Sequence, residues 1–165
     1  MAMVASEMAQ AVINRVRGCD EPVDTNNKVY EAVCNYIESH AEIIYSWAGT
    51  LSGAPDPVVT IKATIKTAGN LVPTGATTPE SAMSAWSSMW NSNMMTWKIV
   101  WPSGFTLSPV LILPTIKFTL SYATDQLSAV THICREIING IKKATPSASG
   151  SHGAFTGVAS FTKVL

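Results

Sequence analysis

Residues 57–69, PVVTIKATIKTAG, mark the point where the hydrophobic pattern of the chain changes from a helical period to a strand period. Apolar side chains alternate strictly with polar ones here, and the apolar positions are Val59, Ile61, Ala63 and Ile65. Strict alternation predicts a half-buried β-strand. The polar side carries Lys62 and Lys66, which favours an edge strand or a face turned to solvent.

Two helices are predicted before this strand. Residues 3–17 repeat an apolar residue at every fourth position, and Gly18 ends the pattern. Residues 26–47 carry a wider apolar stripe, made of Val29, Val33, Tyr36, Ile37, Ala41, Ile44 and Tyr45. A stripe of this width buries one face of a helix. Residues 49–57, GTLSGAPDP, then predict an irregular connector to the strand.

A third helix is predicted after the strand, because the sequence contains a capping box. Thr77 is placed to cap the helix, with Glu80 three residues later, and the helix extends to about Asn91. One of its faces carries large side chains, namely Met83, Trp86, Met89 and Trp90. Serines occupy the opposite face.

The remaining chain predicts two more strands and a last helix. The strands are residues 96–101, TWKIVW, and residues 108–121, SPVLILPTIKFTLS. Pro114 removes a ladder donor, so the second of them belongs at an edge or a bulge. Residues 123–143 predict the last helix, which ends before Pro146.

These elements predict an α+β fold, with three to four helices packed on a small antiparallel or mixed sheet. Residues 1–146 are expected to form a single domain. Residues 147–165, SASGSHGAFTGVASFTKVL, are expected to form an extended C-terminal arm, because they lack a helical stripe and are rich in small residues. Five apolar residues are spaced along this arm: Phe155, Val158, Phe161, Val164 and Leu165.

The chain is unusually poor in charge. Only 13% of its residues are charged, about half the usual share. Residues 1–57 hold three basic and eight acidic residues, a net charge of −5, and the remaining residues hold eight basic and three acidic ones, a net charge of +5. These opposite charges can pair within one fold or between copies. The basic residues form no cluster, which argues against nucleic acid as a partner, and no apolar run is long enough for a membrane helix.

No motif in the sequence indicates a catalytic or metal site. His40, His132 and His152 show no metal-ligand spacing, and there is no nucleophile elbow or phosphate loop. Cys19, Cys34 and Cys134 are all expected to be free thiols. We therefore expect no enzyme activity, no cofactor, no metal and no small-molecule substrate. Histidines and cysteines that converged in a cleft would instead favour an enzyme.

Tryptophans and methionines are concentrated between the third helix and the strand after it. Such side chains are typical either of a core or of the centre of an interface. The cluster is large for the core of one small domain, so part of it is expected to face a partner. The candidate interface residues in it are Trp86, Met89, Trp90, Met94, Trp97 and Trp101.

Residues 36–75, YIESHAEIIYSWAGTLSGAPDPVVTIKATIKTAGNLVPTG, resemble small virion structural proteins of contractile-tailed, T4-like bacteriophages. The resemblance implies a non-enzymatic protein of the tail, baseplate or neck. Such a protein is made in the host cytoplasm, occupies the virion, and binds other virion proteins and copies of itself. A capsid decoration protein is one alternative. A small intracellular enzyme or ligand-binding protein with a tryptophan-lined pocket is another.

The resemblance also implies a role for the C-terminal arm, because virion proteins commonly extend arms over their neighbours. A strand added to a neighbouring sheet gains main-chain hydrogen bonds and side-chain pockets together. We therefore expect residues 147–165 to dock on a neighbouring subunit. The alternative is that this arm packs back on its own domain.

Overall fold

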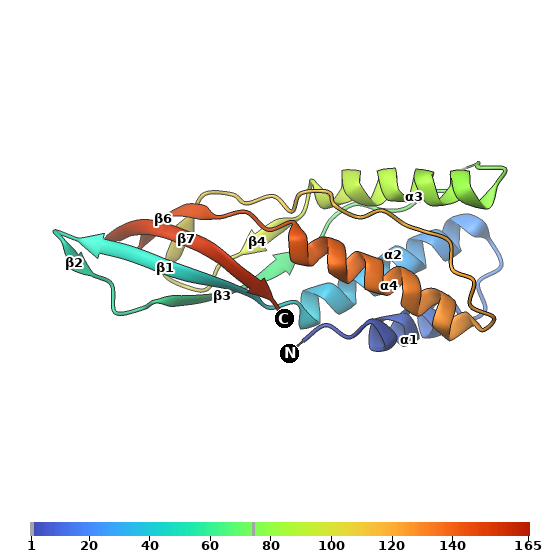
Figure 1. Cartoon of the computed structure of the whole chain (residues 1–165), viewed down its shortest axis with the longest axis horizontal. Coiled ribbons are helices and arrows are strands. Elements are labelled where there is room, and N and C mark those ends of the chain that lie inside the picture. The colour runs from blue at the N-terminus through green and yellow to red at the C-terminus, as the bar shows by residue number, and fades with distance from the viewer. Residues whose placement is uncertain (1, 74) are drawn as a thin grey trace.

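The computed structural model describes residues 2–73 and 75–165, and it has an α+β fold. The helices lie at one end of an elongated molecule and a curled antiparallel sheet lies at the other (Figure 1). In chain order the described elements are α1 (Ala5–Val16), α2 (Pro22–His40), β1 (Ile43–Leu51), β2 (Ala54–Pro55), β3 (Thr60–Lys66), α3 (Pro79–Met94), β4 (Lys98–Val100), β5 (Phe105–Leu107), α4 (Gln126–Lys143), β6 (Ala148–His152) and β7 (Phe155–Val164).

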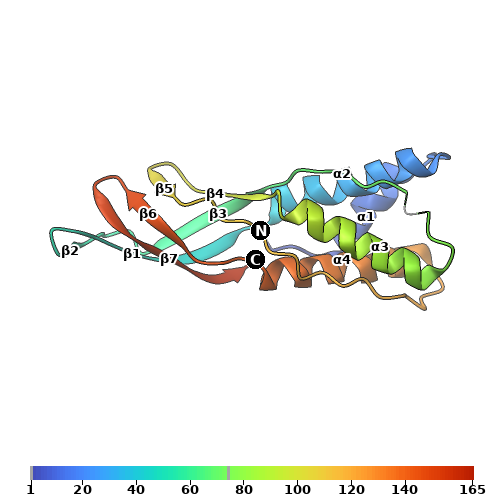
Figure 2. The same ribbon diagram turned by 90° about the horizontal axis from the view of Figure 1, so that it is seen from above.

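The strand order of the sheet explains why it curls. The order is β4-β3-β1-β7-β6-β5, and β2 pairs with the end of β1. The strands β4 and β5 lie at opposite ends of this order, yet only residues 101–104 connect them. The two edges are therefore drawn toward each other, and the sheet closes part of the way to a barrel (Figure 2).

Three glycines allow the strands to approach closely inside this curl. Gly49, Gly157 and Gly150 are direct neighbours across β1, β7 and β6. A Cβ atom on Gly157 would lie 2.0 Å from the carbonyl oxygen of Ala48, and one on Gly150 would lie 2.1 Å from that of Thr106. Because these obstacles are backbone atoms, neither strand can accept a side chain there without moving.

One hydrophobic core runs from the helices into the sheet. The helix α1 packs against both α2 and α4, and α3 covers them from another side (Figures 1 and 2). The largest fully buried side chains come from all parts of the chain: Met8, Ile37, Ile43, Tyr45, Ile61, Leu71, Trp90, Met94, Trp97, Ile112, Ile137 and Ile141. The strand predicted at residues 57–69 is confirmed over Thr60–Lys66 as β3, with Ile61, Ala63 and Ile65 buried. The prediction is wrong for Val59, which precedes the strand and is 63% exposed.

The predicted helix over residues 26–47 is confirmed up to His40 and is wrong over residues 41–47. The helix α2 ends at His40, and β1 begins at Ile43. Side chains 43, 45 and 47 are all buried, as a strand with period two requires. The apolar residues of this segment also fit a helical stripe, so the sequence pattern extended the helix too far.

The start of α3 differs from the predicted capping box by one position. Thr78, not Thr77, is the N-cap, and its Oγ1 accepts a hydrogen bond from the Ser81 amide at 3.2 Å. Ser81 replaces Glu80 as the reciprocal partner, since its Oγ accepts from the Thr78 amide at 3.2 Å. A short hydroxyl side chain performs the role that the sequence assigned to a glutamate.

The predicted strand over residues 108–121 is also wrong. In the described chain this segment makes only one isolated bridge, between Lys98 and Leu111. Beyond Leu113 it lies between α3 and α4, where side chains satisfy its backbone. The Ser87 Oγ accepts from the Phe118 amide at 2.9 Å, and the Thr119 amide donates to the Glu136 carboxylate at 3.1 Å.

The C-terminal segment is extended, as expected, but it folds as a hairpin of β6 and β7 within its own sheet. β7 is an inner strand, with β1 on one side and β6 on the other. Both of its backbone edges are therefore occupied by the same chain. This corrects the expectation that residues 147–165 add to the sheet of a neighbouring subunit; the alternative, packing on the chain's own domain, is what the structure shows.

Candidate functional site

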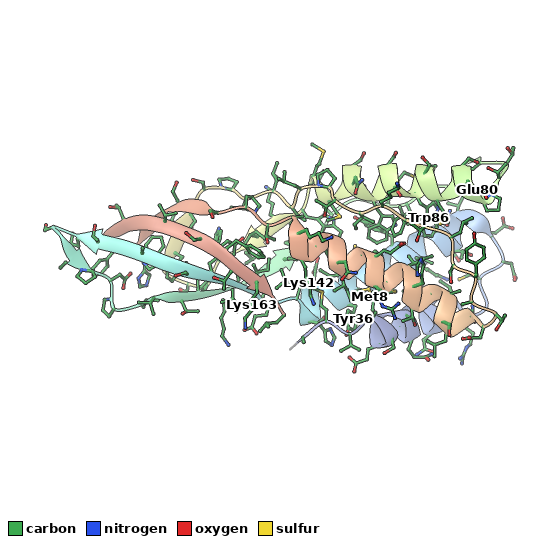
Figure 3. The ribbon with its side chains drawn as sticks, in the orientation of Figure 1. Met8, Tyr36, Glu80, Trp86, Lys142 and Lys163 are labelled. Atoms are coloured by element: carbon green, nitrogen blue, oxygen red, sulfur yellow. The ribbon has the colours of Figure 1, made fainter. Side chains whose placement is uncertain are left out.

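The outer part of the sheet is almost free of charge. It is built by residues 43–61, 99–113 and 144–162, in which Asp56 is the single formally charged residue and His152 the single imidazole. Lys142 and Lys163 lie at the junction of the helices and the sheet (Figure 3). We call the part of the sheet beyond this junction the uncharged sheet end. Depletion of charge is typical of the centre of a protein interface.

Asp56 is the anchor of this end. Its carboxylate is buried, with 5% of the residue exposed. Oδ2 accepts from Trp47 Nε1 at 2.9 Å, and Oδ1 accepts from the Val58 amide at 2.9 Å. Burial opposes its ionisation, but hydrogen bonds from the Val58 amide, His152 and Trp47 outweigh this effect and lower the pKa of Asp56 below its ordinary value.

His152 connects this anchor to two other parts of the chain. Its Nδ1 lies 2.5 Å from Asp56 Oδ2. Its ring stacks on Phe105 with the centroids 4.2 Å apart, and the Phe105 ring meets Trp47 edge-on at 5.5 Å. The link between β2 and β3, the strand β5 and the end of β6 are thus held together by side chains.

One flank of the uncharged sheet end presents an apolar edge. Residues 51–60 are all exposed except Asp56. The aliphatic side chains among them are Leu51, Val58 and Val59, which are 45%, 37% and 63% exposed. We call these three residues the valine edge. It lies on the side of the sheet formed by β2 and β3 (Figure 1).

The other flank presents an apolar groove. A depression of about 330 Å³ lies between residues 108–113 and the strands β6 and β7. Its lining consists of three serines, Ser108, Ser147 and Ser149, together with Pro109, Val110, Leu111, Leu113, Pro146, Ala148 and Val158. Leu111, Leu113 and Val158 are 41%, 50% and 46% exposed. We call this depression the leucine groove.

The structure divides the tryptophan and methionine cluster between the core and its margin. Trp90, Met94 and Trp97 are fully buried, so they belong to the chain's own core. This corrects their assignment to an interface. Trp86 and Met89 are half-buried on α3, and Trp86 is directed toward the other helices (Figure 3).

Trp101 and the predicted residues of the C-terminal arm lie in or beside the sheet. Trp101 is half-buried, with its ring 4.8 Å from that of Tyr45. Val164 is buried, which removes it from the candidate interface. Phe155, Phe161 and Leu165 are half-buried. Val158 is exposed and lines the leucine groove, so it stays a candidate.

Apart from Val158, the residues that form the valine edge and the leucine groove were not predicted from the sequence as interface residues. Leu51, Val58 and Val59 lay in or next to a segment interpreted as a connector, and Leu111 and Leu113 lay in a predicted paired strand. The signal that could have found them is the absence of charge over three separate stretches. These three stretches form one uncharged surface only because the fold brings them together at one end of the sheet.

A small cavity lies between the four helices, and two tryptophans line it, as in the tryptophan-lined pocket considered above. Its volume is about 100 Å³, and it is bounded by apolar side chains that include Val33, Trp86, Trp90 and Ile137. Pockets for small-molecule ligands commonly enclose roughly 300–1,000 Å³ and carry a few placed polar groups. This cavity is smaller and offers no polar surface.

The histidine side chains of α2 and α4 lie within hydrogen-bond distance of other groups of the chain. The His40 Nδ1 lies 3.0 Å from the Tyr36 carbonyl oxygen, and His132 Nε2 lies 2.9 Å from Thr119 Oγ1. Burial raises the pKa of Cys34 to about 11 and that of Cys134 to about 12, so both thiols stay protonated near neutral pH. Among the described residues, no three histidine, cysteine or carboxylate side chains gather as a metal site.

The Asp56–His152 pair resembles the orienting half of a catalytic dyad, but its surroundings favour a structural role. In the part of the chain that the structure describes, no hydroxyl, thiol or amine is hydrogen-bonded to His152 Nε2. The carboxylate is instead saturated by Trp47, Val58 and His152.

None of the helices in residues 2–73 and 75–165 combines the length and apolarity needed to cross a bilayer.

Comparison with known proteins gives no relative: no protein family, no curated protein and no solved structure matches this chain.

Proposed function

We propose that the protein is a non-enzymatic structural subunit of a contractile-tailed bacteriophage virion, located in the tail, baseplate or neck and present in several copies. The observation that carries the proposal is the uncharged sheet end, with exposed aliphatic side chains on both of its flanks. An isolated domain gains nothing from leaving such a surface in water, since burial of apolar area contributes about 25 cal/mol per Å².

The resemblance to virion proteins supports the same reading. Residues 36–75 run from the end of α2 through β1, β2 and β3, so they contain Trp47, Asp56 and the valine edge. The resembling segment therefore includes the anchor and one of the two apolar flanks.

The direct test is to ask whether the protein is part of the particle. Virions of the phage that encodes it are purified, and the chain is quantified by mass spectrometry against a known tail protein. A fixed stoichiometry of several copies per particle is expected. Absence of the chain from intact virions would refute the proposal.

Immunogold labelling of the same particles then locates the protein. Labels on the tail, baseplate or neck are expected. Labels spread over the head would support the capsid decoration alternative and refute the tail assignment. As a matched genetic test, a phage carrying Val59→Glu is expected to lose infectivity, whereas Ser88→Glu, an exposed position on α3, is expected to keep it.

A further inference from the structure

We propose that the helical end of the molecule binds a compact apolar molecule, no larger than a single aromatic ring, in the cavity between the four helices. The cavity has a volume of about 100 Å³, and its described lining residues all belong to α1, α2, α3 and α4. This site lies apart from the uncharged sheet end, so the inference goes beyond the proposed function and does not rest on it.

The lining of the cavity determines the class of ligand. It consists of valines, isoleucines, two tryptophans and Cys134, and these described residues present no nitrogen or oxygen atom to the space. Burial raises the pKa of Cys134 to about 12, so its thiol carries no charge near neutral pH. A polar or charged ligand would lose its hydration here and gain no hydrogen bond, so only an apolar ligand is favoured.

Water is a poor occupant for the same reason. A buried water molecule typically makes about three hydrogen bonds to polar groups of the protein. Trp90 Nε1 has no hydrogen-bond partner among the described residues, but it does not reach the surface of the cavity. In another protein an engineered apolar cavity of about 150 Å³ stays dry and binds benzene or xenon. The cavity here is smaller, so xenon fits and benzene is close to the upper limit of size.

Aromatic contacts keep the space open. The ring centroid of Trp90 lies 4.8 Å from that of Tyr30 and 6.4 Å from that of Trp97. The ring centroid of Trp86 lies 6.1 Å from that of Phe118. Both indoles are thus held against neighbours that do not line the cavity, and the valines of α1, α2 and α4 on its other walls are too short to fill it. A cavity formed before binding costs little conformational entropy when a ligand enters.

The ligand has a short path from solvent to the cavity. The lining residues Val29, Trp86, Val130 and Ile133 are only half-buried, whereas Val33 is 1% exposed. The half-buried residues come from α2, α3 and α4, and Figure 3 shows Trp86 extending from α3 toward the other helices. The cavity therefore lies under a thin layer of side chains, and rotamer changes in that layer are enough to admit a small molecule.

The first test uses xenon and the full-length chain in three forms. These are the wild type, Val33→Phe, which places a larger side chain in the cavity, and Val23→Phe, the control at an exposed position on the same helix. Methyl resonances are followed by NMR as the xenon pressure rises. In the wild type and in Val23→Phe we expect saturable shifts of the methyl groups of Val12 and Ile137, which line the cavity. In Val33→Phe we expect the affinity for xenon to fall about 10-fold or more.

The second test enlarges the cavity, and it decides the question even if Val33→Phe does not fold. Val33→Ala removes two methyl groups from the lining, so the space should accept benzene more readily than in the wild type. Thermal melts are recorded with and without benzene, and Val164→Ala, at a buried valine of β7, is the control. We expect benzene to raise the melting temperature of Val33→Ala by about 3 °C more than that of the control.

Three results would overturn the inference. Absence of saturable shifts in the wild type would mean that the helices close the space in solution. Shifts of the same size in Val33→Phe would mean that xenon binds elsewhere. An equal benzene response of Val33→Ala and Val164→Ala would mean that the ligand does not enter this cavity. The proposed function would be unaffected by any of them, because it depends on the sheet end and on the presence of the chain in virions.

Discussion

Asp56 and His152 are 96 positions apart in the sequence, and their side chains meet 2.5 Å apart in the fold. Asp56 follows the short strand β2, whereas His152 ends β6. The pair therefore fastens the first hairpin of the sheet to the last one. It does so at the uncharged sheet end, where the His152 ring also stacks on Phe105.

We predict that Asp56→Asn lowers the melting temperature by several degrees. An amide keeps the size of the side chain, but it cannot accept as a carboxylate does from Trp47, Val58 and His152 together. Thermal melts at neutral pH test this, with Asp20→Asn, at an exposed position, as the matched control. Equal melting temperatures for the two variants would show that the anchor contributes nothing.

The same carboxylate predicts a pH dependence of stability. The pKa of Asp56 is lowered from its ordinary value of 3.8 in the folded chain, so the folded state binds its proton less readily than the unfolded state does. The stabilisation is complete above the unfolded value and is lost as the pH falls through the folded one. The difference in melting temperature between wild type and Asp56→Asn should therefore shrink as the pH is lowered from about 6 to about 2. A difference that grew on acidification would contradict the assigned sign.

We predict that Gly157→Ala destabilises the fold by about 2 kcal/mol or more. The added methyl group would lie 2.0 Å from the Ala48 carbonyl oxygen, which belongs to the backbone of the neighbouring strand β1. Urea denaturation measures the change in free energy of unfolding. Thr156→Ala, at an exposed position next to it in β7, is the control and should change stability little. A Gly157→Ala chain as stable as the wild type would mean that the strands are farther apart than described.

We predict that Trp97→Phe lowers the free energy of unfolding by about 2–3 kcal/mol and leaves the oligomeric state unchanged. The Trp97 Nε1 donates to the Tyr30 hydroxyl at 3.0 Å and to the Ala68 carbonyl at 2.9 Å, and its side chain is fully buried. Denaturation and light scattering on the same samples separate the two effects. Dissociation of a fully folded Trp97→Phe chain would return this residue to the interface.

Much of the fold could be predicted from local periodicity. Both α1 and α4 followed their apolar stripes, and β3 followed its alternation. The boundary between α2 and β1 could not be found this way, because apolar residues at 41, 44 and 45 satisfy a helical stripe while 43, 45 and 47 satisfy a strand. Tertiary pairing of β1 with β3 and β7 decides between them.

The candidate site was harder to predict, because it depends on contacts between distant segments. Nothing in the sequence near Asp56 indicates that it meets His152, and nothing near Val158 indicates that it lies beside Leu111 and Leu113. The tryptophan cluster had the composition of an interface, but Trp90 and Trp97 are used to fill the space between α3 and the rest of the core. The composition of the cluster fits either a core or an interface, and only the topology of the fold shows that Trp90 and Trp97 belong to the core.

The place of β7 in the sheet has a consequence for how this protein is made. The strand that pairs with one side of β1 is β7, which follows all the other described strands in the chain. A nascent chain therefore carries β1 with that side unpaired until residues 155–164 have been synthesised. The leucine groove, which needs Val158 from β7, is likewise incomplete until that strand has been synthesised.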